Sequence, residues 1–379
     1  MKRTIVYVNP QSMLNLSIYD HHLMSAIEGE IHYVCSKFYD YKPLPTNIRQ
    51  HRLFRYNRLK SNIAKAVSYI FTCLQFFICL LFWRPQIIHI QWLRIPFFDL
   101  YFYKLVKCVL HCHIVFTAHN ILPHDTGERQ KNLYIKFYRL TDRIIVHTNS
   151  TKQELLSVFN VPANKVAVIA HGIIHLNFDQ QELTTSLTAL NSQYHLKGKM
   201  VFSCLGHQYY YKGVDVIAKV WAETPELRNN SHCCLLLIGR NRGVDFSIVS
   251  NIENVIIEDR LLTDVEFYYL LRHTDVHLLT YRTISQSGLL LTAISTETPV
   301  LVTDIGGLTD PLDVAPIGWV LPHFDEDHLR KQLLWFLDHP EEIEKVKNDK
   351  TSWGLVHKHY NWDNIGRQTQ QLYEQVCLS

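Results

Sequence analysis

The chain has 379 residues, of which 47% are hydrophobic and 19% are charged. This composition excludes a disordered chain, and the length exceeds what one compact core covers, so two folded domains are expected. The net charge of +3 hides an uneven distribution, because residues 1–179 carry 21 Lys and Arg against 10 Asp and Glu, whereas residues 180–379 carry 17 against 25. A basic first half predicts contact with an anionic surface or ligand.

Two kinds of partner fit a basic half. The chain shows no zinc-finger, basic-helix or RNA-binding motif, which argues against nucleic acid. An anionic membrane surface fits better, because an apolar, aromatic segment follows five cations, Arg49, Arg52, Arg55, Arg58 and Lys60. A solvated basic helix face is the alternative interpretation of these cations.

The apolar segment Ala66–Trp83 contains 18 residues without a charge and reaches the threshold length of a transmembrane helix. Pro85 and a predicted strand at Ile87–Gln91 follow at once. A membrane span would put this strand and the amino-terminal strand on opposite sides of the bilayer. We therefore expect a helix that is buried or faces a membrane, rather than one that crosses it.

The cysteines and histidines indicate neither a disulfide framework nor a metal centre. The nine cysteines have no framework spacing, and several lie within apolar runs, where a reduced thiol behaves as a small core residue. Lys2 and Arg3 lead directly into the first strand, so we expect no signal peptide and a cytoplasmic protein. No pair among the 22 histidines has metal-ligand spacing with a third partner, so no metal is expected.

The first half of the chain alternates predicted strands and helices. A strand at Thr4–Asn9 precedes a helix near Tyr19–Ile27 and a strand at Ile31–Cys35. Later strands, each preceded by a helix, are predicted at Ile87–Trp92, His113–Asn120, Arg143–Ser150 and Lys165–Gly172. Repeated units of this length predict a parallel sheet covered by helices on both faces.

Residues 173–198 lose this alternation and are polar and mixed, which predicts a connection between domains. Strands then return at Met200–Gly206, Cys233–Gly239, Asn254–Asp259, Val276–Thr280 and Val300–Thr303, with a helix at Gly213–Trp221 and a helical tail at Thr351–Cys377. The expected fold is α/β, with two doubly wound, Rossmann-like domains that face a cleft. The expected boundaries are 1–175, a connection at 176–198, a second domain at 199–355 and a tail at 356–379.

One strand–loop–helix unit in the second half predicts an anion site. The strand Val276–Thr280 is followed by a polar loop, and Ser287 has the character of an N-cap before an apolar helix. Ligands of parallel sheets bind beyond the carboxyl ends of the strands, where the free amides of Ser287, Gly288 and Leu289 point and the helix dipole favours an anion. An ordinary Ser-Gly helix start beneath a structural loop is the alternative.

A second candidate lies between a strand and a helix at Gly206–Gly213. Lys212 in this loop can project into the cleft as a point charge for phosphate. An exposed loop lysine without a ligand explains the same pattern.

Several motifs together resemble the retaining nucleotide-sugar glycosyltransferases of family 4, which have the two-domain GT-B fold. In the second half they are Tyr211-Lys212-Gly213-Val214-Asp215, Ser285-Gln286-Ser287-Gly288, Thr298-Pro299-Val300 and Asp304-Ile305-Gly306-Gly307-Leu308. In the first half, residues 119–124 (HNILPH) and 147–150 (HTNS) resemble bacterial surface-polysaccharide members of the family.

The resemblance implies that the second domain binds a nucleotide-diphospho sugar and that the first domain holds the acceptor. Lys212 would neutralise the diphosphate, helped by the amides of residues 287–289, while Gln286 and Ser287 would bind sugar hydroxyls or phosphate. Gly239 and Arg240 lie where the base is received. His119 corresponds to the histidine that faces the donor sugar and phosphate across the cleft, and it is the catalytic candidate.

The resemblance also implies a chemistry and a location. Transfer would proceed with retention, and the enzyme would mainly stabilise charge on the departing diphosphate without a metal or cofactor. The expected acceptor is a polyprenyl-diphosphate-linked saccharide, extended for surface polysaccharide by an enzyme bound peripherally to the inner face of the cell membrane.

The chain departs from the family pattern at four positions. The two signature glutamates of the family are replaced by Ser285 and Thr292. The usual arginine after Gly206 is His207, and Glu297 replaces a glycine although it tolerates a left-handed backbone poorly. Two alternatives follow: a GT-B partner protein with weakened catalysis, and a sugar-nucleotide 2-epimerase, against which the shortage of cleft carboxylates argues.

Four further residues are weaker acceptor candidates. Asn9 ends the first strand, Asp20 follows it and is a candidate to act on the acceptor hydroxyl, and His21 and His124 are candidates for acceptor contact. For each histidine a structural role is the alternative.

Overall fold

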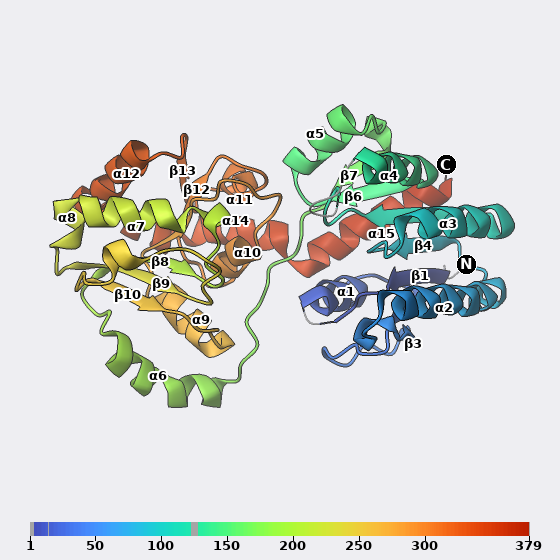
Figure 1. Ribbon diagram of the computed structural model, residues 1–379, viewed down its shortest axis with the longest axis horizontal. Helices are drawn as coiled ribbons and strands as arrows, with labels where there is room; N and C mark the ends of the chain where they lie inside the picture. The colour runs from blue at the N-terminus through green and yellow to red at the C-terminus, as the bar shows by residue number, and fades with distance from the viewer. Residues whose placement is uncertain (1–3, 14, 123–127, 379) are drawn as a thin grey trace. The chain divides into compact units, whose positions relative to one another are not determined.

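The computed structural model describes residues 4–13, 15–122 and 128–378. The chain divides into two compact units (Figure 1). The first contains residues up to Gly172 together with the carboxyl-terminal stretch from Tyr360, and the second runs from Ile173 to His359. Each unit is built on one parallel sheet, as the alternation of strands and helices predicts.

The first unit has a seven-stranded sheet of order β3-β2-β1-β4-β5-β6-β7, and every neighbouring pair is parallel. Its strands are β1 (Thr4–Asn9), β2 (Glu30–Ser36), β3 (Ile48–Phe54), β4 (Ile87–Ile90), β5 (His113–Thr117), β6 (Arg143–Val146) and β7 (Val166–Val168). Its helices are α1 (Asn15–Ser25), α2 (Asn62–Trp83), α3 (Pro96–Leu110), α4 (Glu128–Leu140), α5 (Asn149–Val158) and α15 (Trp362–Leu378).

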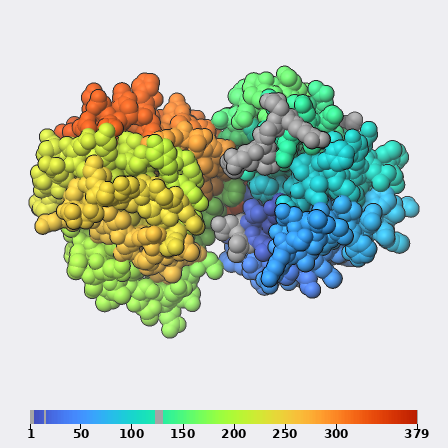
Figure 2. Space-filling model, in the orientation of Figure 1, coloured from blue at the N-terminus to red at the C-terminus, as the bar shows by residue number. Residues whose placement is uncertain are grey.

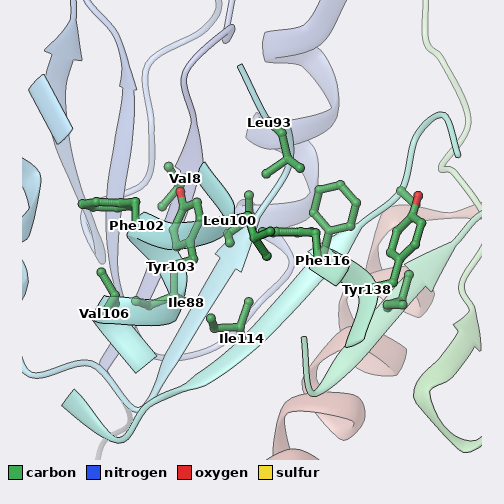
Figure 3. Packing of buried hydrophobic residues seen from close by; sticks show 14 of the residues in the cluster. Val8, Ile88, Leu93, Leu100, Phe102, Tyr103, Val106, Ile114, Phe116 and Tyr138 are labelled. Atoms are coloured by element: carbon green, nitrogen blue, oxygen red, sulfur yellow. The ribbon is translucent and has the colours of Figure 1, made fainter. Parts of the chain in front are cut away.

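Helices cover both faces of this sheet, so successive residues of each central strand are buried on opposite sides. In β1, Val6 and Val8 pack into the core under α2, α3 and α4, whereas Ile5 and Tyr7 pack into the core under α1 and α15. Figure 3 shows the first of these cores, in which side chains of α3 lie over Ile88 and Ile114 of the sheet.

The second unit has a six-stranded sheet of order β10-β9-β8-β11-β12-β13, again entirely parallel. Its strands are β8 (Met200–Leu205), β9 (Cys233–Ile238), β10 (Val255–Glu258), β11 (Val276–Leu279), β12 (Val300–Thr303) and β13 (Gly318–Leu321). Its helices are α6 (Gln180–Tyr194), α7 (Val214–Glu223), α8 (Pro225–Arg228), α9 (Asp264–Arg272), α10 (Gly288–Ser295), α11 (Asp310–Val314), α12 (Glu326–Asp338), α13 (Pro340–Asn348) and α14 (Lys350–Tyr360).

The predicted connection at 176–198 contains helix α6, which belongs to the second unit. Asp179 caps this helix, and Leu183, Leu190 and Tyr194 bury one stripe of it in the core that it shares with α9. The remaining positions are exposed and polar, which is why the segment looks like a linker in the sequence. The second unit therefore begins at Ile173 rather than at residue 199.

The predicted tail at 356–379 is also divided differently. Helix α14 ends at Tyr360, and the following helix, α15, packs on α1 and on the first sheet through Ile365, Leu372 and Tyr373. Gly366 permits this contact, because a Cβ there would lie 2.2 Å from the carbonyl oxygen of Ala26. The carboxyl terminus thus completes the core of the first unit.

The sequence prediction missed two strands, β13 in the second unit and β3 in the first. Residues 48–54 form the edge strand β3, so Arg49 and Arg52 lie on a sheet edge and their interpretation as a helix face is wrong. Charged side chains at such an edge oppose pairing with further strands.

We predict that Ile365→Ala lowers the free energy of unfolding by about 2–4 kcal/mol, because it removes a fully buried side chain between α15 and the sheet. Urea denaturation followed by tryptophan fluorescence measures the change. Gln375→Ala, at an exposed position of the same helix, serves as the control and should change stability by less than about 0.5 kcal/mol. Equal stability of the two variants would contradict the placement of α15 in the core.

Candidate functional site

The carboxyl ends of β8 and β9 bring two glycines into contact. Gly206 and Gly239 both have positive φ angles, of 81° and 148°. A Cβ on Gly239 would lie 1.8 Å from the carbonyl oxygen of Gly206, so only glycine allows the two loops to approach this closely. The loops then pair through the amide of Gln208, which donates to the carbonyl of Arg240 at 2.9 Å. This pairing places the loop of His207 beside Arg240. Both residues are predicted to contact the donor.

Lys212 is a buried cation without a counter-ion. Its side chain is 8% exposed, and its ammonium lies 5.8 Å from the ring centroid of Tyr281. Among the described residues it has neither an ion-pair nor a hydrogen-bond partner. Burial lowers its pKa to about 8. A charge that is removed from water and left unpaired is expensive, so this site favours an anion.

The loop of Lys212 is held by contacts that the sequence did not reveal. Gly213, with φ 73°, packs against the carbonyl oxygen of Thr280 at the end of β11. Arg282, in the loop that follows β11, forms a two-pronged ion pair with Asp215 at 2.7 Å and lies over the ring of Tyr210. The Asp215 of the family motif thus fixes one loop to the next instead of facing a ligand.

Helix α10 begins beside Lys212, as the sequence predicts. Ser287 is its N-cap and accepts a hydrogen bond from the amide of Leu290, and Leu289 and Lys212 line one small cavity. The hydroxyl of Ser287 also lies 3.3 Å from that of Tyr281, so it is largely occupied within the protein. Backbone amides at the helix start therefore remain the better candidate for anion contact.

Ser285 and Thr292, which replace the two glutamates of the family, differ in exposure and in hydrogen bonding. Ser285 is exposed, and its carbonyl accepts from the amide of Gly307, which binds the loop of Gln286 to the Asp-Ile-Gly-Gly turn. Thr292 is 6% exposed, and its hydroxyl donates to the carbonyl of Gly288 within the first turn of α10. Of these two residues, only Ser285 is exposed.

The side chain of His207 is partly buried near two cations. The Nδ1 atom of His207 is buried without a hydrogen-bond partner in the described part of the chain, and burial together with Arg242 and Lys212 lowers its pKa. A neutral imidazole beside two cations can donate to an anion.

A Cβ on Gly288 would lie 3.3 Å from Ile174, so this glycine is packed on one side rather than fully open.

The departure at Glu297 has a local explanation. This residue follows the end of α10 and has a φ of 53°, the left-handed conformation that a glycine would adopt more easily. Its carboxylate forms an ion pair with Lys350 at 2.7 Å. The left-handed turn of the family is therefore retained with a less suitable residue, and the ion pair helps to hold it.

In the first unit, four histidines gather at the carboxyl ends of neighbouring strands. They are His89, His119, His147 and His171. His119 Nε2 lies 2.9 Å from the side chain of Gln91, and its Nδ1 lies 3.2 Å from Nε2 of His147. Trp92 stacks on the imidazole of His119 with 5.0 Å between ring centroids. Sequence analysis had singled out only His119, although the other three also follow strands or end them.

Burial keeps this histidine cluster neutral. The pKa values of His89 and His147 fall to about 3 and that of His171 to about 4, and the pKa of His119 lies well below its ordinary value, in each case mainly because of desolvation. The Nδ1–H of His147 donates to the carbonyl of Ile169 at 2.9 Å. Both ring nitrogens of His119 lie within hydrogen-bond distance of protein atoms, Nδ1 of His147 Nε2 and Nε2 of Gln91 Oε1.

A cavity of about 380 Å³ opens beside His119 within the first unit. Its lining includes Gln91, Trp92, Arg94, His119 and Asn120. An exposed guanidinium, an indole ring and several amide groups are a lining that suits a polar, anionic or saccharide ligand.

The weaker acceptor candidates lie elsewhere. Asn9 and Asp20 are at most 1% exposed, and the Asp20 carboxylate accepts hydrogen bonds from Asn9, Tyr7 and Tyr33. Burial raises the pKa of Asp20 to about 7. The two residues are structural, and the prediction that they contact an acceptor is wrong because no ligand can reach them.

The two histidine candidates have different outcomes. His21 is 9% exposed and packs against Tyr39 and Tyr41, so a structural role fits it better than acceptor contact. His124 lies outside the described residues.

Over the described ranges, no three His, Cys, Asp or Glu side chains gather as a metal site would require.

We predict that Lys212→Met stabilises the ligand-free protein. An ammonium whose pKa falls from 10.5 to about 8 on folding costs the folded state up to about 3 kcal/mol near pH 7. This cost is complete below pH 8 and disappears as the pH rises toward 10.5, because the unfolded lysine then also loses its proton. The gain should therefore shrink in alkaline solution, as urea denaturation at pH 7 and pH 10 would reveal.

The control is Lys331→Met, which removes an exposed lysine of the same unit and should leave stability nearly unchanged. A destabilised Lys212→Met variant would contradict the view that the ammonium is uncompensated.

Comparison with known proteins identifies both halves of the chain. Residues 28–175 match the family described as Glycosyltransferase Family 4, and residues 199–339 match the family described as Glycosyl transferases group 1. An uncharacterized glycosyltransferase of Methanocaldococcus jannaschii is 23% identical over 250 residues, which cover 61% of this chain and only 60% of that relative.

Solved structures show the same architecture over the whole chain. A sucrose-phosphate synthase from Thermosynechococcus elongatus has a TM-score of 0.69 at 16% identity and covers 99% of both chains. The Anabaena protein HepE in complex with UDP-glucose has a TM-score of 0.67 at 9% identity, with 98% of this chain and 99% of that chain covered. These likenesses concern the fold. With two parallel α/β units and both family matches, the chain belongs to the family 4 type of glycosyltransferases and has their two-domain GT-B fold with a carboxyl-terminal helix.

Proposed function

We propose that this glycosyltransferase moves a sugar from a nucleotide-diphospho sugar to a polyprenyl-diphosphate-linked saccharide, with retention of anomeric configuration, in surface-polysaccharide synthesis. The observation that carries the proposal is the buried ammonium of Lys212 beside the start of α10, which has no ion-pair partner among the residues that the structure describes. A diphosphate is the anion that such a site suits best, because it offers several charged oxygens to one cation and to backbone amides.

The donor base and sugar have their own candidates. Gly239 packs closely on Gly206 at the end of β9, and the exposed Arg240 that follows it, which lies 3.5 Å from Asp259, is the candidate contact for the base. Gln286 and the exposed Ser285 are available to sugar hydroxyls. HepE, of the same fold, binds UDP-glucose, which supports a uridine nucleotide as the first donor to test.

In the proposed chemistry, the enzyme acts mainly by stabilising the leaving group. As the glycosidic bond to phosphate breaks, negative charge grows on the diphosphate, and preorganised donors stabilise it without reorganisation. Lys212, the amides at the start of α10 and His207 would supply these donors, so the proposal requires no metal. The incoming hydroxyl of the acceptor would attack from the face that the diphosphate leaves.

The ribose lacks its usual carboxylate partner in this proposal. Thr292 is buried and bonded within α10, so it cannot replace the missing glutamate by direct contact. Ser285 offers a neutral hydroxyl instead of a charge. We therefore expect donor affinity to depend more on the diphosphate than on the ribose.

The cavity beside His119 is the proposed acceptor site. Arg94 would meet the acceptor diphosphate, and Trp92 offers an apolar ring face to a sugar. His119 would contact the reacting sugars as a neutral imidazole held in place by Gln91 and His147, because its pKa is held well below 6.5. Since the polyprenyl chain of the acceptor is confined to a bilayer, peripheral binding at the cytoplasmic face of the membrane is part of the proposal.

We predict that Lys212→Met weakens binding of uridine diphosphate about tenfold or more, because it removes the charge-assisted contact. Titration calorimetry at pH 7 tests this, with Lys331→Met as the matched control. In the native chain, affinity should fall between pH 7 and pH 9 as Lys212 loses its proton, and this pH dependence should vanish in Lys212→Met. Unchanged affinity in Lys212→Met would refute the diphosphate site.

We predict that His119→Ala reduces sugar transfer at least tenfold while the affinity for uridine diphosphate stays within twofold of the native value. A radiolabelled UDP-sugar and extracted lipid-linked acceptor supply the assay, and His232→Ala, at an exposed position of the second unit, is the control. Thermal melting checks that the histidine cluster still folds. Full transfer by His119→Ala would remove this residue from the catalytic role.

The same assays separate the alternatives. A sugar-nucleotide 2-epimerase would convert the donor without any acceptor, and incubation with donor alone would reveal the epimer. A partner protein without catalysis would show no transfer and no affinity for any nucleotide diphosphate. The family membership of both halves favours transfer over these two.

A further inference from the structure

Helix α2 carries apolar side chains on two opposite faces. The inner face is buried in the core of the first unit and includes Tyr69, Cys73, Phe76 and Leu80. The outer face is exposed along the whole helix and consists of Ile63, Val67, Ile70, Phe71, Leu74, Ile78, Leu81 and Phe82. Both sets recur every three or four residues, so the exposed set is a continuous stripe and not scattered side chains.

Helix α3 extends this exposed stripe. Phe97, Tyr101, Leu105 and Val109 are spaced four residues apart and are 46–60% exposed. The two helices are in direct contact, since Phe102 of α3 packs against rings of α2. We call the twelve exposed residues of the two stripes the α2–α3 apolar face. Its helices form part of the surface drawn in light blue and cyan in Figure 2.

An exposed apolar surface of this extent marks an interaction site, since isolated apolar residues are the norm on soluble surfaces. Phe82 and Ile63 are 81% and 77% exposed, at opposite ends of α2. Helix α2 is also the one described helix that is long and apolar enough to cross a membrane.

The inner face of α2 argues against a crossing. Phe76 and Leu80 are fully buried under the sheet, and the hydroxyl of Tyr69 donates to the buried carboxylate of Asp99 at 2.8 Å. At the end of the helix, Trp83 packs against His32 and His51 of the sheet. A span would withdraw all of these groups from the core, so α2 can meet a bilayer only with its outer face, parallel to the membrane plane.

The surrounding charge selects the kind of surface. The sequence contains no Asp or Glu between Asp40 and Asp99, and Asp99 itself is fully buried. The same interval holds nine Lys and Arg residues. Lys60 and Lys65 lie at the start of α2, Arg84 at its end, and Lys104 on the outer side of α3.

We propose that the α2–α3 apolar face docks into the interfacial layer of an anionic phospholipid bilayer, with the exposed Lys60, Arg84 and Lys104 on the lipid phosphates. Aromatic and aliphatic side chains enter the acyl boundary, and a basic rim attracts anionic headgroups. A second copy of the chain fits this face less well, because pairing two such faces would bring two basic rims together.

The position of the face connects it with the acceptor cavity. Pro96, the first residue of α3, lines that cavity together with Arg94, and Phe97 of the apolar face follows directly. A lipid acceptor could therefore keep its hydrocarbon chain in the bilayer while its diphosphate reaches Arg94. The docking deepens the membrane binding that belongs to the proposed function, but it is argued from exposure and charge and does not depend on sugar transfer, whereas this last step rests on the proposed acceptor.

Cosedimentation with vesicles tests the docking. The native chain should bind vesicles of phosphatidylglycerol and bind vesicles of phosphatidylcholine at least tenfold more weakly. The variant Phe71→Ser/Phe82→Ser should bind phosphatidylglycerol at least tenfold more weakly than the native chain. The control Leu261→Ser, which alters a side chain 68% exposed in the second unit, should bind like the native chain. Lys60→Glu/Lys104→Glu should reduce binding to phosphatidylglycerol but leave the weak binding to phosphatidylcholine unchanged.

Three results would overturn the proposal. One is equal vesicle binding by the native chain and the Phe71→Ser/Phe82→Ser variant. Another is a native dimer, measured by light scattering, that this variant converts to a monomer, since the face would then be a protein interface. Resistance of bound protein to alkaline carbonate extraction would likewise contradict in-plane docking and indicate a span. If the double variant fails to melt cooperatively, Phe82→Ser alone replaces it.

Affinity for uridine diphosphate separates this inference from the proposed function. The docking variants should keep native affinity for the nucleotide in solution, because Lys212 and α10 belong to the other unit. Vesicle binding without sugar transfer would sustain the docking and refute the enzyme, whereas transfer without vesicle binding would do the reverse.

Discussion

A lysine that is removed from water, with no carboxylate partner in the described part of the chain, is the constraint on which the second unit depends. The ammonium of Lys212 sits at the carboxyl end of a parallel sheet, where the loops after β8, β9, β11 and β12 converge. Arg282 and Asp215 satisfy each other and hold the lysine loop in place, so they do not neutralise Lys212. The buried charge thus lowers the stability of the folded protein, and it remains available to an anion.

The first unit uses its buried polar groups differently. Its histidines are uncharged and joined to one another, to Gln91 and to the backbone, so the ring of His119 is held in one orientation. A neutral, oriented imidazole suits contact with a sugar more than it suits charge neutralisation. The second unit therefore offers a positive charge to a ligand, whereas the first unit offers uncharged rings in a fixed orientation.

Helix α2 links the core of the first unit to its surroundings. A helix that is apolar all round belongs inside a large protein or in a membrane. Here the inner stripe stabilises the sheet while the outer stripe remains exposed, next to a stretch of chain that is rich in cations and nearly free of acids. Both properties follow from one composition, because the same run of apolar residues supplies both faces.

The sequence by itself determined the alternation of strands and helices, the two parallel sheets, the Lys212 loop and the N-cap at Ser287. These features depend on local patterns and on glycines whose spacing is visible along the chain. Tertiary structure alone decided that α6 and α15 are parts of the two cores, that residues 48–54 pair as an edge strand, and that Asp20 is buried while Ser285 is exposed. Periodicity shows which residues are apolar but not which partner covers them. For the same reason, only the packed structure could show that one half of the apolar surface of α2 is left uncovered.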